Sequence, residues 1–218
     1  MADIEIVGLP QSVYVRVVRM ACEEKGVPYK LRPVVPRSAD AMELHPFGKI
    51  PSMRHGDVTL FESKAITTYI DRMFGGPRLI PDDTVSAATV EQWISACTTT
   101  ILPAMSRYVQ CYFFPKGPGG QPDRDAIEAA LPGVLQSLTV LDRAVAATGY
   151  LAGRQFTLAD LYPLPVLAYL RALPEGCAAV EREKNLNSYF ETHSQRASFR
   201  NTVPPPLQDL ERVRAAIS

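Results

Sequence analysis

Strand-forming patterns fill only the first third of this chain, and every later stretch has helical spacing. Short apolar runs at residues 4–7 and 29–35, and a hairpin pattern around residues 55–57, stop by residue 75. Beyond that point apolar residues recur every three or four positions. We therefore expect an α/β N-terminal domain followed by an all-α C-terminal domain.

The first part has the element order βαβ, then ββα. Its first helix is expected to begin at Ser12, a favoured N-cap residue, and to end at Gly26, which suits a C-terminal cap. The strand that contains Pro33 belongs at a sheet edge, because proline has no backbone N–H to donate. The last helix is expected to open at Glu62-Ser63 and to run to Met73. The pattern predicts a small mixed sheet with helices packed on it.

The domain limits follow from the same patterns. Residues 1–76 are expected to form the α/β domain, 77–85 a proline-containing linker and 86–218 the helical domain. One helix start within the last part is sharply marked, because Thr157 and Asp160 have the spacing of a capping box. The helices expected there span residues 86–112 with a bend at Pro103, 123–148, 157–171, 178–190 and 207–217.

Charge and cysteine content exclude several classes of protein. The 23 basic and 23 acidic residues cancel, which leaves no chain-wide basic field for non-specific nucleic-acid binding. No apolar stretch approaches the roughly 20 residues of a membrane span, and the N-terminus lacks a signal-peptide pattern. The four cysteines lack CxxC spacing, and the three histidines lack metal-ligand spacing. We expect a cytoplasmic globular protein with no metal site and neither a nucleic-acid nor a membrane partner.

Four short motifs follow one another along the chain. They are Gly8-Leu9-Pro10-Gln11-Ser12 with Arg16; His45-Pro46-Phe47-Gly48-Lys49-Ile50-Pro51; Leu60-Phe61-Glu62-Ser63-Lys64-Ala65-Ile66; and Tyr150-Leu151-Ala152-Gly153 with Phe156-Thr157-Leu158-Ala159-Asp160. In order and spacing they resemble the glutathione S-transferase family. The first part then resembles that family's thioredoxin-like domain, and the second its helical domain. The serine of the first motif is most similar to the serine-type classes, phi and theta, with phi the nearer.

The resemblance implies an enzyme that attacks a hydrophobic electrophile with the thiolate of glutathione, with peroxide reduction as a variant. Glutathione is then a co-substrate, and no permanently bound cofactor is expected. At an ordinary thiol pKa of ~8.5, only about 3% of it is ionised at pH 7, whereas a pKa lower by ~1.5 units ionises about half. Ser12 is the catalytic candidate, because its hydroxyl can donate to the sulfur at a positive helix N-terminus. The alternative is that Ser12 is only a helix cap.

The resemblance also assigns the residues that bind glutathione. Glu62 helps to hold the amino group of the γ-glutamyl end, and Ser63 takes its carboxylate at a helix N-terminus. Ile50 and Pro51 resemble the family's cis-proline turn, which leaves the Ile50 backbone to pair with the cysteinyl amide. Lys49 is the candidate for the glycine carboxylate. Simple alternatives are a plain cap for Ser63 and a solvated lysine for Lys49.

The sequence leaves two alternative roles for Arg16, one in the candidate site and one in the fold. It lies one helical turn past Ser12 and can orient the serine by hydrogen bonding. The alternative is that it pairs with an acid such as Glu62 and serves only the fold.

Two positions depart from the phi pattern. Residues 36–41 lack the histidine that usually helps to bind the glycine end, so this task falls to Lys49 alone or to Arg37. His45 stands where asparagine is common, and it is expected to be a loop residue and not a base.

The second substrate is expected to meet the end of the first long helix. Tyr108, Cys111 and Tyr112 cluster there, and an apolar wall with phenol hydroxyls suits a hydrophobic electrophile. These three residues form the predicted hydrophobic substrate site. The alternative for each is ordinary core packing.

Other functions stay open, because a fold does not fix a function. One alternative is a non-catalytic relative that serves as a binding or protein-interaction module. The retained Ser12, Glu62, Ser63 and Ile50-Pro51 favour the enzyme, whereas the missing loop histidine speaks against it. Dehalogenation or ether cleavage would use the same glutathione site. The resemblance further implies a homodimer and a role in detoxification.

Overall fold

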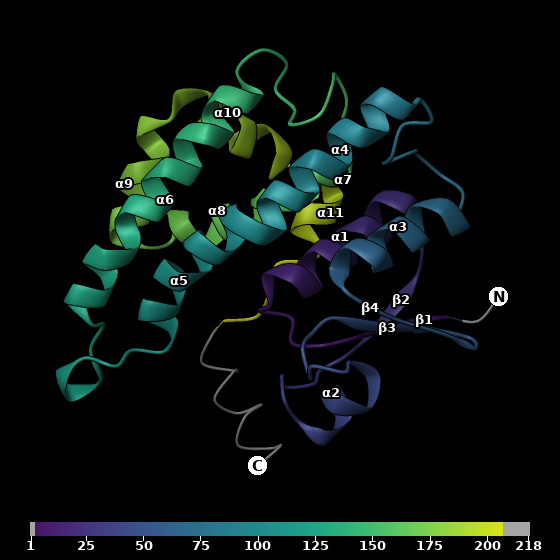
Figure 1. Cartoon of the computed structure of the whole chain (residues 1–218), viewed down its shortest axis with the longest axis horizontal. Helices are drawn as coiled ribbons and strands as arrows, with labels where there is room; N and C mark the ends of the chain where they lie inside the picture. The colour runs from purple at the N-terminus through teal and green to yellow at the C-terminus, as the bar shows by residue number, and fades with distance from the viewer. Residues whose placement is uncertain (1–2, 207–218) are drawn as a thin grey trace. The chain divides into compact units, whose positions relative to one another are not determined.

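The structure is a computed structural model that describes residues 3–206 (Figure 1). They form two compact units: an α/β unit, which contains the chain up to Leu79 and again from Arg196, and a helical unit, Ile80–Gln195. The predicted helical domain included the residues from Arg196 onward, which this division groups with the α/β unit. The chain returns to the α/β unit because Arg196 donates two hydrogen bonds to Glu24, at 2.7 and 2.6 Å. The helix predicted at 207–217 lies outside the described residues.

A four-stranded mixed sheet forms the centre of the α/β unit. The strands lie in the order β2-β1-β3-β4, with β1 parallel to β2 and antiparallel to β3, and β3 antiparallel to β4. The predicted edge position of the second strand is confirmed, and that strand stops directly before Pro33. The strands are β1 (Ile4–Val7), β2 (Tyr29–Arg32), β3 (Ser52–His55) and β4 (Val58–Phe61).

Helices cover both faces of this sheet: Figure 1 shows α1 and α3 on one face and α2 on the other. α1 follows the N-cap Ser12 and ends at Gly26, whose φ of 64° is left-handed, so both predicted ends are confirmed. α2 was not predicted, because six residues are too few to show a helical period. The helices are α1 (Val13–Lys25), α2 (Ala39–Leu44), α3 (Ser63–Met73) and the C-terminal α11 (Ala197–Arg200).

Side chains that alternate along β1 build the two apolar layers. Ile4 and Ile6 belong to one buried cluster, together with residues of α1 and α3 such as Val18 and Ile66. Val7 belongs to a second cluster with residues such as Leu44 of α2. The sheet is thus packed on both faces, which fixes the turns that follow its strands.

The helical unit contains more breaks than the apolar pattern predicted. The bend expected at Pro103 is a π turn at Cys97–Ile101, where the Leu102 N–H donates to the Cys97 carbonyl five residues back. The stretches at 157–171 and 178–190 each divide into two helices. The elements are α4 (Thr84–Ala96), α5 (Leu102–Phe113), a short 3₁₀ turn (Pro118–Gly120), α6 (Arg124–Val145), α7 (Leu158–Leu161), α8 (Pro163–Arg171), α9 (Pro174–Arg182) and α10 (Lys184–His193).

The predicted capping box of the helical unit is confirmed. The Asp160 carboxylate accepts the Thr157 N–H at 2.9 Å and the Leu151 N–H at 2.9 Å. Tyr189 of α10 donates its hydroxyl to the same carboxylate at 3.2 Å. One buried acid thus joins a helix start, the loop before it and a distant helix.

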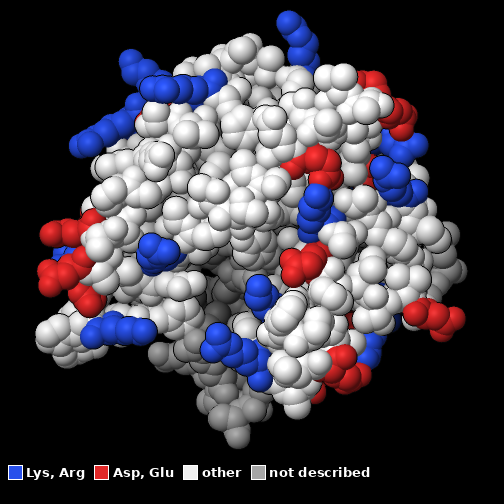
Figure 2. All heavy atoms as spheres, viewed as in Figure 1, with Lys and Arg blue, Asp and Glu red and all other residues white. Residues whose placement is uncertain are grey.

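The face of the molecule in Figure 2 is mixed in charge. Figure 2 shows Lys and Arg interspersed with Asp and Glu over the visible face, in keeping with the zero net charge of the chain. Between residues 3 and 206, no helix is long and apolar enough to cross a membrane. In the same range, no group of three or more His, Cys, Asp or Glu side chains could hold a metal ion.

Candidate active site

Ser12 occupies the N-cap of α1, at the end of the turn that leaves β1. Its Oγ accepts a hydrogen bond from the Val15 N–H at 3.4 Å. A hydroxyl carries one proton and two lone pairs, so a cap that uses a lone pair leaves the proton available to donate. The two roles predicted for Ser12, helix cap and donor to a sulfur, are therefore compatible.

Gly8 brings the Ser12 turn against the loop that contains the predicted cis-proline. Its φ of 148° is unusual for residues with a side chain. A Cβ at this position would lie 2.6 Å from Cγ2 of Val15 and 3.0 Å from Cβ of Ile50. This close approach requires glycine, and it joins the first and second motifs in one site.

The Ile50-Pro51 peptide bond is cis, which confirms the predicted isomer. Gly48, two residues before this bond, holds the loop by two backbone hydrogen bonds. Its carbonyl accepts the Arg37 N–H at 2.7 Å, and its N–H donates to the backbone carbonyl of His45 at 2.8 Å. Both candidates for the glycine carboxylate, Lys49 and Arg37, are exposed and lie on these adjoining loops.

Glu62 and Ser63 start α3. Glu62 has a φ of 67°, a conformation that costs a non-glycine residue about 1–3 kcal/mol. It stands at the N-cap but makes no side-chain cap hydrogen bond, and its side chain is 61% exposed. Uncapped N–H groups at the start of an 11-residue helix suit a carboxylate ligand, as predicted for the γ-glutamyl end. Ser63 is buried beside them.

Arg16 is buried and joins α1 to α11. Its guanidinium donates to the Phe199 carbonyl at 3.0 Å and lies 4.1 Å from the centre of the Phe199 ring. It also donates to Oγ1 of Thr202 at 3.4 Å. These contacts favour the second predicted role, support of the fold, over orientation of Ser12.

Tyr108 belongs to the core of the helical unit, which favours the alternative interpretation of this residue, ordinary core packing, over a place in the hydrophobic substrate site. Its side chain is fully buried, and its hydroxyl donates to Glu175 at 2.9 Å and accepts the Gly176 N–H at 3.0 Å. Tyr112 donates to the same carboxylate, and so does Arg124 at 2.7 Å. Burial opposes ionisation of Glu175, but the hydrogen bonds from Tyr112 and Arg124 lower its pKa to about 2.

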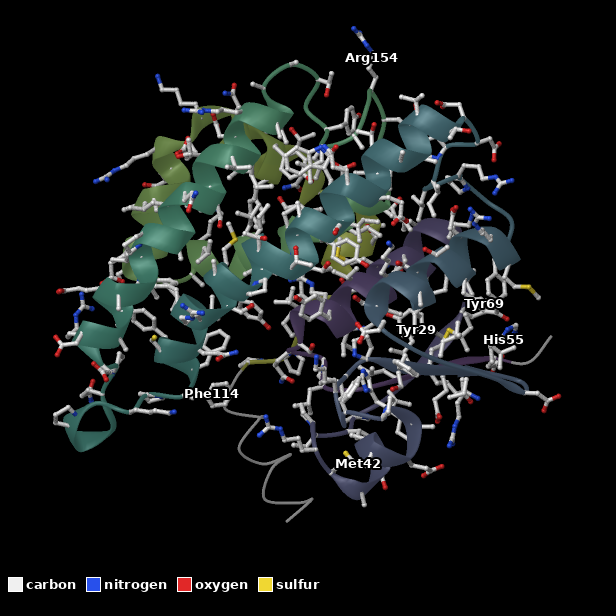
Figure 3. The ribbon with its side chains drawn as sticks, viewed as in Figure 1. Tyr29, Met42, His55, Tyr69, Phe114 and Arg154 are labelled. Carbon is white, nitrogen blue, oxygen red and sulfur yellow. The ribbon has the colours of Figure 1, made fainter. Side chains whose placement is uncertain are left out.

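Cys111 and Tyr112 are partly exposed on α5, and they stay predicted contacts of the electrophile. The Cys111 Sγ donates to the Arg107 carbonyl at 3.3 Å within the helix. Phe114, labelled in Figure 3, follows α5 directly and is 36% exposed. The end of α5 thus presents apolar surface in addition to its buried side.

His45 is the site residue that sequence reasoning missed. It was expected to be an ordinary loop residue, but its side chain is 2% exposed and its Nε2 lies 3.7 Å from Oε1 of Glu62. The only signal in the sequence was its departure from the asparagine that is common at this position. A histidine there links the second and third motifs.

Together these features define a class of protein. A serine at a helix start, a cis-proline loop and a Glu-Ser helix start surround one end of a four-stranded thioredoxin-like sheet, and a helical unit accompanies it. Residues 6–78 match the family described as Glutathione S-transferase, N-terminal domain, and residues 94–197 match Glutathione S-transferase, C-terminal domain. The chain belongs to the glutathione S-transferase family and is a glutathione transferase.

Plant enzymes are among the similar proteins. Glutathione S-transferase 3 of Zea mays is 33% identical over 220 residues, which cover 94% of this chain and 98% of the relative. The solved structure of glutathione S-transferase III in apo form has a TM-score of 0.81 at 32% identity, covering 94% of this chain and 100% of that one. Glutathione S-transferase I from mais in complex with an atrazine glutathione conjugate has a TM-score of 0.82 at 25% identity, covering 92% and 96%. The phi-class resemblance is confirmed.

Proposed function

We propose that the α/β unit holds glutathione and that Ser12 stabilises its thiolate, which attacks a hydrophobic electrophile. The sulfur forms the new bond to carbon, the leaving group departs with its electron pair, and the thiol proton passes to solvent. The observation that carries the proposal is the contact of the Ser12 turn with the Ile50 loop across Gly8. A related solved structure holds an atrazine glutathione conjugate, which supports conjugation as the reaction.

Each end of glutathione has a partner of suitable chemistry in this proposal. Ser63 and the N–H groups of α3 take the γ-glutamyl carboxylate, and Glu62 takes the amino group. The Ile50 backbone pairs with the cysteinyl amide. Lys49, with Arg37 on the adjoining loop, takes the glycine carboxylate. Cys111 and Tyr112 contact the electrophile. We further propose that the enzyme acts in the cytoplasm and has a role in detoxification.

Steady-state conjugation of glutathione to an aryl halide tests the proposal. We expect turnover well above the uncatalysed rate. Ser63→Ala should raise the KM for glutathione about 10-fold or more, because a hydrogen bond to a charged group contributes about 1.5–3 kcal/mol. Its kcat should change little, since this bond is remote from the sulfur.

Other results would favour the alternatives. Glutathione binding without turnover, by calorimetry and with several electrophiles, would indicate the non-catalytic binding module. Turnover with an organic hydroperoxide but no aryl halide would move the activity to peroxide reduction.

We also propose that the enzyme is a homodimer. Met42 and Phe47 are 52% and 69% exposed, and Phe61, 38% exposed, lies near the same histidine ring as Phe47. Exposed apolar residues gathered in this way are typical of an interface. Phe47→Ser is expected to raise the dimer dissociation constant at least 10-fold in sedimentation experiments, whereas Val85→Ser, at an exposed position of the helical unit, should not. Equal constants for both variants would place the interface elsewhere.

A further inference from the structure

The loop before the cis-proline holds a buried histidine that the reaction described above does not use. His45 follows α2 directly, at its C-cap, and its side chain is 2% exposed. Its ring packs on Phe47 and Phe61, with ring centroids 6.0 and 4.8 Å away. The imidazole is thus buried against two aromatic rings, which restricts its rotation.

The loop backbone sets which nitrogen of this imidazole carries the proton. The Phe47 N–H donates to Nδ1 of His45 at 3.1 Å. A nitrogen that accepts a hydrogen bond has a free lone pair, so the proton of the neutral ring is on Nε2. Nε2, which then carries the proton, lies 3.7 Å from Oε1 of Glu62, within ion-pair distance and just beyond hydrogen-bond distance.

The surroundings of the ring favour its neutral form. Burial lowers the pKa of His45 below its ordinary value, Glu62 opposes this shift, and Lys49 adds to it. A neutral donor orients a carboxylate but leaves its negative charge in place. A protonated histidine would cancel that charge and compete with any cation that the carboxylate binds.

A partner that restrains the Glu62 side chain would favour ligand binding. This side chain is 61% exposed, and an unrestrained glutamate side chain loses rotamer entropy when a ligand fixes it. A rigid N–H near one carboxylate oxygen removes part of that loss before the ligand arrives. The other oxygen stays available for an ammonium group.

We propose that His45 is a positioning residue that orients the Glu62 carboxylate and makes the site selective for a ligand with a free γ-glutamyl amino group. This inference rests on the proposed role of Glu62 in glutathione binding. In this inference, the histidine that stands where asparagine is common has a function in substrate selection.

Calorimetric titration with two ligands tests the inference. S-methylglutathione has the amino group but no thiol, so its affinity does not depend on thiolate formation; its N-acetyl derivative lacks the basic amino group. His45→Phe keeps an aromatic ring and removes the donor, and it should weaken S-methylglutathione about 10-fold. Affinity for the N-acetyl derivative should not change. His45→Gln, which retains an N–H donor, should recover most of the loss.

Three further variants separate positioning from a general effect on the fold. In the double variant His45→Phe/Glu62→Gln, we expect no more loss than in Glu62→Gln alone, because His45 acts through Glu62. His55 is the matched control: it is also buried in the α/β unit, and its Nδ1 lies 2.8 Å from the Tyr69 hydroxyl (Figure 3). His55→Phe should leave the ratio of the two affinities unchanged, with thermal unfolding followed for every variant.

The outcomes distinguish the inference from the proposed function. Equal weakening of both ligands by His45→Phe, or losses that add in the double variant, would overturn the positioning role alone. If Glu62→Gln leaves S-methylglutathione binding unchanged, the role of Glu62 fails and the inference fails with it. If the unaltered protein does not bind S-methylglutathione, the proposed function itself is wrong.

Discussion

Replacing Asp71 by alanine is expected to lower the free energy of unfolding by about 3–5 kcal/mol. Its Oδ1 lies 3.1 Å from Nζ of Lys25, and the two side chains are 0% and 1% exposed. The ammonium group also donates to the Pro77 carbonyl at 2.9 Å, and the same Oδ1 accepts the Leu79 N–H at 2.8 Å. Without the carboxylate, a buried positive charge loses its counterion and a buried N–H loses its acceptor. The change therefore acts on α1, α3 and the segment that follows α3 together.

Urea unfolding followed by circular dichroism measures this effect. Asp3→Ala is the control, because Asp3 pairs with Lys30 at 3.0 Å but the two side chains are 58% and 76% exposed. An exposed pair contributes about 0–1 kcal/mol, so the control should unfold almost like the unaltered protein. Lys25→Met/Asp71→Leu, which removes both charges, should recover much of the stability lost in Asp71→Ala. Equal midpoints for Asp71→Ala and Asp3→Ala would contradict the role of the buried pair.

Local signals explain why the start of the fold could be predicted. The ends of α1 depend on Ser12 and Gly26, residues whose capping chemistry acts within one helical turn. The capping box between Thr157 and Asp160 is equally local. Such interactions can be recognised in a sequence, because both partners are only a few positions apart.

Contacts between distant residues explain what could not be predicted. The partner of Tyr108, Glu175, lies 67 positions along the chain, and helical spacing does not show whether an apolar face meets solvent or another helix. Arg16 and Phe199 are 183 positions apart, so nothing near either residue indicates that the chain returns to α1. The contact of His45 with Glu62 depends on a turn at positive φ, which glutamate rarely adopts.

The motifs predicted the site better than patterns of hydrophobicity did. The isomer of the Ile50-Pro51 bond and the start of α3 at Ser63 agree with the resemblance. The roles of these residues toward glutathione stay predictions. The helix cap at Ser12 uses a lone pair of the hydroxyl and leaves the hydroxyl proton available. An experiment on Ser12 must therefore remove the hydrogen-bond donor and keep the cap.

Replacing Ser12 by alanine is expected to reduce turnover about 15-fold at pH 7. Without the hydroxyl donor, the pKa of the bound glutathione thiol should rise toward its ordinary ~8.5, so the thiolate fraction falls from about half to about 3%. A group with a raised pKa ionises fully once the pH exceeds that value. The difference between the variant and the unaltered enzyme should therefore shrink above pH 9, where both bound thiols are ionised.

Aspartate at the same position separates the cap from the donor. Asp caps a helix about as well as Ser, so Ser12→Asp should retain the stability of α1, whereas Ser12→Ala should lose about 0.5–2 kcal/mol of it. A carboxylate cannot donate to a sulfur and repels a thiolate, so Ser12→Asp should be at least as inactive as Ser12→Ala. Thiolate absorbance of bound glutathione across pH, together with turnover, measures the pKa directly. An unchanged thiol pKa in both variants would leave Ser12 as a helix cap, and the positive N-terminus of α1 would then have to stabilise the thiolate alone.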